Sequence, residues 1–276
     1  MSFFGRLSSV FLCFQLLCIS AIAQEVLPDA PTPHIETAAS NATTANVQPV
    51  LHTKPHEQWK TTTEQYFEFM IVLHAFRLAQ PKTRDMLGGP FFPQWQQSIT
   101  AIGDGWNDGD SIFTNDVLHP AQGSVYSYLY LQNQPRDRTL TFANTSAYWD
   151  SRLRASAFSF LASTQFEIGP LSEATIGHVG VRPHTQGLTD FVMTPVGGLG
   201  MNVLQDWIDK RLIEPNEPRA SAARVRFWRT AGNPARSIAN LLRHKTPWYR
   251  DSRPLICRDC RQHPAAAALS STPASP

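Results

Sequence analysis

Residues 188–212 have the sequence LTDFVMTPVGGLGMNVLQDWIDKRL, in which apolar side chains recur at helical spacing around three glycines. An isolated glycine costs about 1 kcal/mol inside a helix, so Gly197, Gly198 and Gly200 indicate close packing against a neighbouring element. The predicted neighbour is a long helix over residues 146–166. Small side chains there let another helix approach: Ala155, Ser156, Ala157, Ser159, Ala162 and Ser163.

Four more segments carry helical signals. Residues 61–79 place apolar side chains at i, i+3, i+4 and i+7, and residues 95–102 form a short helix before Gly103. Residues 120–131 begin with Pro120, which suits a first helical position, although their tyrosines would also suit a strand. Residues 234–244 follow Asn233, a typical N-cap. The sequence shows no alternation of strand and helix segments, no evenly spaced short strands and no internal repeat. The sequence therefore predicts an all-α, irregular helical bundle with long Pro/Gly-rich loops and disordered termini, its helical domain spanning residues 55–250.

The amino-terminal segment has the composition of an export signal. Arg6 precedes an apolar stretch over residues 10–22, and residues 21–23 form an A-x-A cleavage site. We predict a signal peptide over residues 1–23, a disordered leader over 24–54, and a Cys-containing, mostly disordered tail over 251–276. An uncleaved anchor, or a lipid on Cys13 or Cys18, is the alternative. The mature protein is expected in the periplasm or associated with the cell envelope.

Composition limits the fold classes that this chain can adopt, and the distribution of charge indicates its binding partners. Of the 276 residues, 42% are hydrophobic and 17% are charged, which excludes a disordered polyelectrolyte and a coiled coil. Residues 24–209 contain 10 basic and 18 acidic side chains, whereas residues 210–262 contain 13 and 4. The basic stretch interleaves cations with aromatic rings, which predicts contact with an anionic membrane surface or an envelope protein, and not with nucleic acid. Alternatively, these cations pair with the acidic part of the chain. The residues in question are Arg224, Arg226, Trp228, Arg229, Lys245, Trp248 and Arg250.

Three polar residues are candidates for chemistry. His119 precedes Pro120, so we expect it at a helix N-cap, where the helix dipole favours the neutral imidazole. Glu167 ends one predicted helix, where a carboxylate is unfavourable, and Asp190 begins the next. If those helices are antiparallel, both carboxylates lie at one end of the bundle. The alternatives are that His119 and Asp190 only cap their helices.

Two further motifs have simpler explanations. Residues 104–110, DGWNDGD, resemble half of a calcium loop but lack a glutamate at position 12, so we predict Asx-type turns there. Cys257 and Cys260 form a CxxC pair outside any βαβ context and without a histidine at position 261. A local disulfide between Cys257 and Cys260 is therefore predicted.

The ordered pattern His119-Pro120-x-x-Gly123, Ser163 to Glu167, and Asp190-x-x-x-Thr194-Pro195-x-Gly197-Gly198-x-Gly200 resembles a family of uncharacterised bacterial envelope proteins. Its later part is distantly similar to VanZ-like membrane proteins. The resemblance covers about residues 105–212 and brings no established reaction. It implies that His119, Glu167 and Asp190 belong together, as a divalent-metal or acid–base site to which His178 or His184 adds a nitrogen, or as a hydrogen-bonded packing network.

Two functions follow from these observations. The first is a non-enzymatic binding or structural module at a membrane surface in the envelope. The second is a metal-assisted or acid–base enzyme that acts on an envelope lipid or glycan, with His119, Glu167 and Asp190 as its catalytic residues. No G-x-S-x-G motif is present, which disfavours a serine hydrolase.

Overall fold

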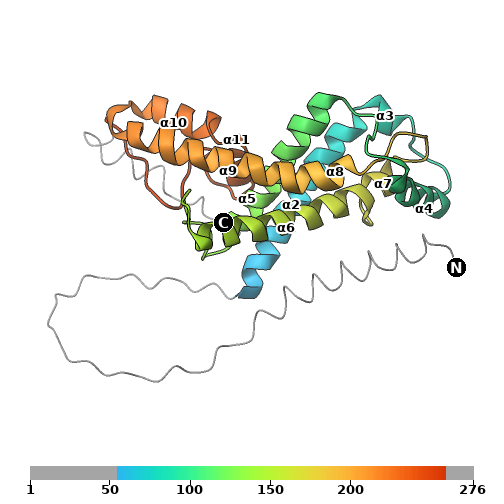
Figure 1. The fold of residues 1–276 in the computed structure, drawn as a ribbon, viewed down its shortest axis with the longest axis horizontal. Helices are drawn as coiled ribbons and strands as arrows, with labels where there is room; N and C mark the ends of the chain where they lie inside the picture. The colour runs from blue at the N-terminus through green and yellow to red at the C-terminus, as the bar shows by residue number, and fades with distance from the viewer. Residues whose placement is uncertain (1–54, 259–276) are drawn as a thin grey trace, which may run out of the picture. The chain divides into compact units, whose positions relative to one another are not determined.

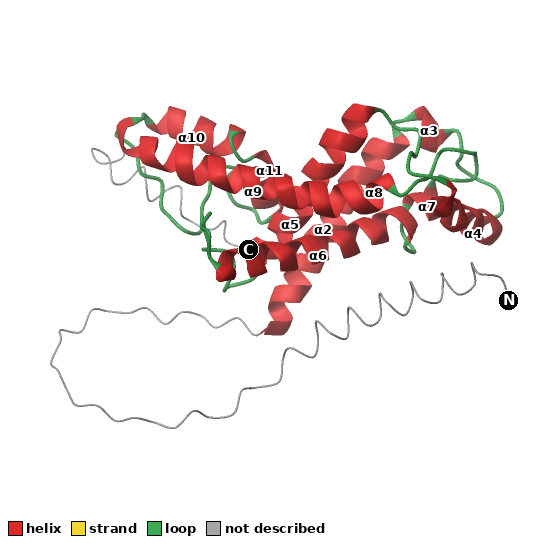
Figure 2. Ribbon diagram, viewed as in Figure 1, coloured by secondary structure: helices red, strands yellow, loops and turns green. Residues whose placement is uncertain are grey.

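The computed structural model describes residues 55–258, and all regular secondary structure among them is helical (Figures 1 and 2). The all-α prediction is confirmed. The principal helices are α2 (Pro55–Leu78), α4 (Phe91–Ala101), α5 (His119–Asn133), α6 (Ser146–Ile168), α9 (Gly198–Ile208), α10 (Ala222–Ala231) and α11 (Pro234–Leu242); the short ones are α3 (Pro81–Arg84), α7 (Glu173–Ile176) and α8 (Thr189–Val192). The predicted signal peptide, leader and Cys260 lie outside the described residues.

Helix α5 is the centre of the bundle. It contacts α2, α6, α9 and α11, and nearly all its residues are buried. Aromatic rings fill the space toward α2: Tyr66 and Phe69 each lie 5.6 Å from the ring of Tyr126. Burial on every side explains why the tyrosine-rich sequence of α5 is helical, since packing outweighs its β-propensity.

The helix that contains His119 begins earlier than predicted. Helical backbone starts at Ile112 and passes through a wide π-turn, η2 (Thr114–Leu118), directly into α5. The prediction that His119 is an N-cap residue is therefore wrong, because the residue before it is already helical. A regular α-helix cannot accommodate the ring and missing N–H of Pro120, and the wide turn relieves that conflict.

The glycine-bearing segment is likewise one long helix with a wide turn. Asp190 lies in α8, which continues through the π-turn η3 (Met193–Gly197) into α9, and Pro195 lies inside that turn. A second π-turn, η4 (Asp209–Ile213), and a 3₁₀ turn, η5 (Glu214–Arg219), extend it further. π-turns inside helices often occur at functional sites.

The two wide-turn helices touch backbone to backbone. A Cβ atom on Gly123 would overlap the carbonyl oxygen of Thr194, and one on Gly198 would lie 2.8 Å from the carbonyl carbon of Gly123. A Cβ atom on Gly197 would lie 2.7 Å from Cγ of Pro120. Gly200, in contrast, faces open space. Gly197 and Gly198 therefore have the predicted packing role, but the atoms nearest to them belong to α5 and not to the predicted partner α6.

Helices α5, α6 and α9 also meet around one buried aspartate. The carboxylate of Asp206 accepts hydrogen bonds from Tyr128 (2.8 Å), Tyr148 (3.0 Å), Arg152 (2.7 and 2.9 Å) and Arg236 (2.9 Å). Burial alone would raise the pKa of Asp206, but the two guanidinium groups outweigh it and lower the pKa. This network fixes the register of the helices at the end of the bundle opposite His119.

Three parts of the prediction need correction. Helix α10 was not foreseen, α4 begins at Phe91, and the carboxyl-terminal segment 251–258 packs on the bundle. Arg253 bonds Asp209 at 3.0 Å and Glu217 at 2.9 Å, and the amide of Arg258 donates to the carbonyl of Ala220 at 2.9 Å. The predicted tail therefore does not begin at residue 251. Among residues 55–258, no helix is both long and apolar enough to cross a membrane.

Gly123→Ala tests the backbone contact between α5 and η3. The added methyl group overlaps the Thr194 carbonyl, so the free energy of unfolding should fall by about 3 kcal/mol or more, the upper range for overpacking. Gly200→Ala is the matched control, and it should raise stability by up to about 1 kcal/mol because alanine is the better helix former. Urea unfolding measures both; equal effects of the two substitutions would contradict the contact.

Candidate functional site

The structure brings His119 and Asp190 together at the contact between the two wide-turn helices. Nε2 of His119 lies 3.0 Å from Oδ1 of Asp190, and Nδ1 lies 3.4 Å from the hydroxyl of Thr194. His119 is 4% exposed and Asp190 is 2% exposed. The position of each side chain follows from the backbone contact at Gly123, because His119 lies one turn before that glycine and Asp190 one turn before Thr194.

A third ligand-type residue joins them from the loop before α5. Asp108, His119 and Asp190 each offer one nitrogen or oxygen atom, and these atoms lie within 4.8 Å of one another. Asp108 is held in place by the Asx turn that the sequence predicted: its Oδ1 accepts from the amide of Asp110 at 3.0 Å and from Nδ2 of Asn115 at 3.1 Å. We call Asp108, His119 and Asp190 the polar centre.

The polar centre is surrounded by buried charge. Arg77 forms a bidentate ion pair with Glu173 and a 3.1 Å bond to Asp110. Lys82 bonds Asp110 at 2.9 Å and Asp108 at 3.2 Å. Burial would raise the pKa of Asp110, but Arg77 and Lys82 outweigh it and lower the pKa to about 2. These contacts tie α2, α3 and α7 to the loop that supplies Asp108.

Glu167 lies at the same end of the bundle, and its environment raises its pKa. It is 1% exposed, and its Oε1 has no hydrogen-bond partner. Burial raises its pKa well above the usual range, and the nearby carboxylates of Asp190 and Glu173 raise it further, whereas Arg77 and Lys82 act in the opposite direction. The fold therefore favours the protonated form of the Glu167 carboxyl group.

The hydrogen bonds of the polar centre are incomplete. Nε2 of His119 and Oδ1 of Asp190 are close, but neither makes a hydrogen bond of acceptable geometry. Burial alone would lower the pKa of His119, yet the Asp190 carboxylate outweighs it, so the pKa is raised. An imidazole nitrogen and a carboxylate oxygen 3.0 Å apart fit either a shared proton or two ligands of one metal ion.

Two residues predicted as metal ligands fall outside the polar centre. His178 is buried, but its ring faces Phe91 and its Nδ1 has no partner, so it does not join His119 and Asp190. The backbone of His178 is in the left-handed region, with φ of +49°. Glu167 is an electrostatic neighbour of Asp190, not one of the three grouped ligands. The additional ligand beside His119 and Asp190 is Asp108, and not His178 or His184 as the sequence predicted.

The predicted basic and aromatic surface is only partly exposed. Arg229 is 1% exposed and bonds Glu217 at 2.6 and 2.7 Å, and Arg250 is 3% exposed and bonds Asp209 at 3.0 Å. Both are structural ion pairs within the chain, so their assignment to a surface is wrong. Arg224 and Trp228 are exposed. Arg226, Lys245 and Trp248 are half-buried, with the Arg226 guanidinium 5.3 Å from the Trp248 ring.

Cys257 is fully buried and disulfide-bonded. Its predicted partner, Cys260, lies outside the described residues, so the pairing stays a prediction. Sequence reasoning also missed Asp108, Arg77 and Lys82 as neighbours of His119. The available signal was the sequence DGWNDGD, which was explained by turns alone because it lacks a full calcium-loop pattern.

Comparison with known proteins adds no assignment: no family model matches the chain, and no similar protein was found among curated proteins or solved structures.

Glu167→Gln tests the raised pKa of the Glu167 carboxyl group. Because the folded-state pKa of Glu167 is raised, the wild-type protein loses stability as the pH rises above about 4.5, by up to about 1.4 kcal/mol per pH unit, until the folded-state pKa is passed. Glutamine does not titrate, so the variant should be clearly more stable than wild type at pH 8 and close to it at pH 5. Urea unfolding of metal-free protein measures the difference.

Glu64→Gln, at a 58% exposed carboxyl of α2, is the control and should leave the pH dependence of stability unchanged. A Glu167→Gln effect of the same size at both pH values would show that Glu167 is ionised in the folded protein.

Proposed function

We propose that this protein is an exported helical binding module whose polar centre, Asp108, His119 and Asp190, holds a divalent cation. The observation that carries the proposal is the convergence of three buried ligand atoms from separate parts of the chain, two of them without a directed hydrogen bond. Export is proposed from the apolar segment before the A-x-A site at residues 21–23.

The charge balance supports a cation. Five carboxyl groups face two basic side chains, Arg77 and Lys82, in the region around His119. Four of them are buried, those of Asp108, Glu167, Glu173 and Asp190, and that of Asp110 is partly buried. Unpaired buried charge is costly, so the deficit must be met by protons or by a bound cation. The raised pKa values of Glu167 and His119 favour protons that meet part of it, and a divalent ion would replace the proton of His119 and meet the rest.

The ligand types indicate which ion fits. One imidazole nitrogen and two carboxylate oxygens suit zinc or manganese better than calcium, which prefers six or more oxygen atoms. Burial of all three side chains favours an ion that fixes the packing of α5 against α8 and the loop of Asp108. The ion would then serve the fold, as a structural metal does.

Metal analysis tests the centre. Purified protein should contain stoichiometric zinc or manganese, and saturating metal, at 100 times the dissociation constant, should stabilise it by about 2.7 kcal/mol. His119→Ala should lose both the metal and the stabilisation. His178→Ala removes an equally buried histidine outside the centre and should keep them. Unchanged metal content with a lower melting temperature in His119→Ala would instead show a packing network.

A second function is favoured by one specific observation. Glu167, a buried acid with a raised pKa, is an electrostatic neighbour of Asp190, which in turn lies 3.0 Å from His119, and neighbouring acid and base groups with shifted pKa values are typical of acid–base catalysis. The corresponding enzyme would act on an envelope lipid or glycan. Wild-type protein would then release fatty acid or reducing sugar from envelope preparations, and Glu167→Gln would reduce this at least 100-fold while staying folded. No release by folded wild-type protein would exclude it.

A further inference from the structure

The long helix from α8 through α9 has its polar side inward. Its buried residues include Asp190, Thr194, Asn202, Gln205, Asp206 and Asp209. Its exposed residues are large and apolar, and they recur along its outer side with Gly200, which faces open space, on the same line. We call these exposed residues the outer stripe: Leu188 (44% exposed), Val192 (38%), Val196 (63%), Leu204 (51%), Trp207 (39%) and Leu212 (52%).

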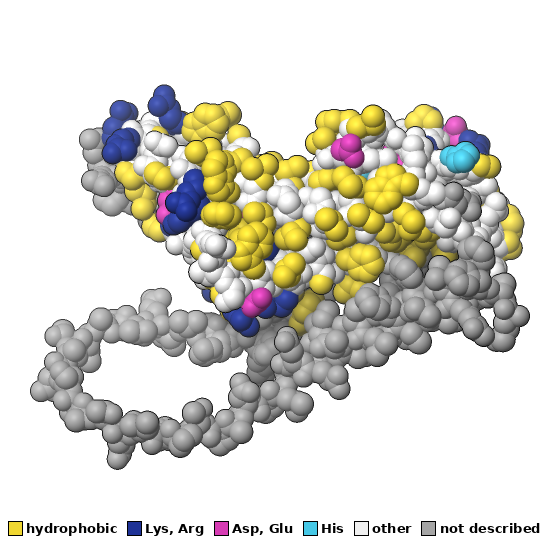
Figure 3. Space-filling model, viewed as in Figure 1, with side chains coloured by type: hydrophobic (Ala, Val, Ile, Leu, Met, Phe, Trp, Pro, Cys, Tyr) yellow, Lys and Arg dark blue, Asp and Glu magenta, His cyan; other side chains and the backbone are white. Residues whose placement is uncertain are grey.

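This arrangement is the reverse of a helix on a water-exposed protein surface, which turns its apolar side to the core. Figure 3 shows hydrophobic side chains along the face that α8 and α9 cross in Figure 1. Contiguous apolar surface of this kind marks a binding face. The inner contacts of the helix are also made by small and polar groups: Ser163 donates to the carbonyl of Asp190, and Gly198 packs on Gly123. Such interfaces are common where helices adjoin lipid.

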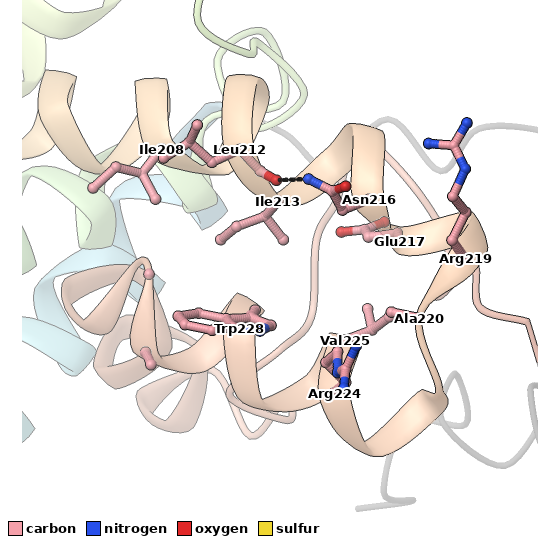
Figure 4. Close-up of a pocket in the computed structure, with 12 residues that line it drawn as sticks. Ile208, Leu212, Ile213, Asn216, Glu217, Arg219, Ala220, Arg224, Val225 and Trp228 are labelled. Carbon is pink, nitrogen blue, oxygen red and sulfur yellow. Dashed lines mark hydrogen bonds between the residues drawn. The ribbon is translucent and has the colours of Figure 1, made fainter.

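A groove continues the outer stripe at its carboxyl-terminal end. It has a volume of about 590 Å³ and lies between residues 208–220 and α10, with Leu212 shared by both features (Figure 4). Ile208, Ile213 and Trp228 line its apolar part. Two polar side chains in its wall are already engaged. Glu217 bonds Arg229 and Arg253, and the side-chain amide of Asn216 donates to the carbonyl of Leu212 at 2.7 Å.

Two arginines lie at the polar end of the groove. Arg219 and Arg224 are exposed, and neither forms an ion pair within the part of the chain that the structure describes. Arg211, also exposed, lies one residue before Leu212. The apolar outer stripe thus ends in a group of positive charges, as amphipathic surfaces do where they meet anionic lipid. A neighbouring copy of this chain would have to supply matching acidic residues, whereas an anionic bilayer supplies phosphate at every point.

We propose that the outer stripe and the groove dock on the surface of an anionic phospholipid bilayer. The outer stripe lies at the boundary between headgroups and acyl chains, the groove accepts apolar lipid atoms, and Arg219 and Arg224 contact headgroup phosphates. This surface shares Arg224 and Trp228 with the basic segment singled out from the sequence, but it leaves out Arg229 and Arg250, which are buried. The proposal goes beyond the cation centre and does not depend on it.

Vesicle flotation tests the docking surface. The full chain should float with vesicles of phosphatidylcholine and phosphatidylglycerol, and weakly with phosphatidylcholine alone or at high salt. Replacing both arginines by serine should weaken binding to anionic vesicles about 30-fold, at about fivefold for each cation. Val196→Asp combined with Leu204→Asp should abolish flotation on both vesicle types. The control is Ile71→Asp on α2, which is 67% exposed and lies outside the outer stripe.

The helical circular dichroism of each variant is checked first, and Val196→Asn with Leu204→Asn replaces the aspartate pair if that pair does not fold. Flotation that survives the outer-stripe substitutions, or that Ile71→Asp abolishes equally, overturns the proposal. A change in oligomeric state on outer-stripe substitution, with flotation unchanged, would assign the surface to a second copy of the chain. A failure of metal binding leaves this result unaffected, so the two proposals are separable.

Discussion

The close contact between α5 and the η3 turn is the constraint on which the other features depend. At Gly123, Gly197 and Gly198 the two helices approach until no side chain fits between them. Each helix is widened by a π-turn near its proline, and this changes the angular position of the residues that follow. His119 and Asp190 meet only because both deviations occur at the same contact. A geometric requirement of the backbone therefore determines the chemistry of the site.

The bundle is held together largely by polar groups in its interior. Asp206 is surrounded by two arginines and two tyrosines at one end, Asp209 and Glu217 hold three arginines beyond it, and the polar centre occupies the other end. Buried ion pairs of this kind contribute little net stability relative to apolar packing. Removing one partner, however, strongly destabilises the fold because it leaves an uncompensated buried charge. They give the helices a defined register where apolar contacts alone would permit sliding.

The sequence was sufficient for most of the helices and for the proximity of His119 and Asp190, because hydrophobic period, proline and glycine are local signals. It was insufficient where an interaction crosses the fold. The ion pairs of Arg229 and Arg250 depend on Glu217 and Asp209, which lie 12 and 41 residues away, so these arginines looked like surface residues. Asp108 was not predicted as a neighbour of His119, because an Asx-type turn already accounted for the sequence around it. The N-cap expectation for His119 failed because a π-turn has no simple sequence signature.

The inverted polarity of the α8–α9 helix also bears on the temperature dependence of folding. Exposure of apolar surface raises heat capacity on unfolding, and exposure of polar surface lowers it. Here part of the apolar surface is already outside, and the buried side of the helix is rich in amide, hydroxyl and charged groups. The heat-capacity increment per residue should thus be small, which flattens the stability curve and moves cold denaturation to lower temperatures.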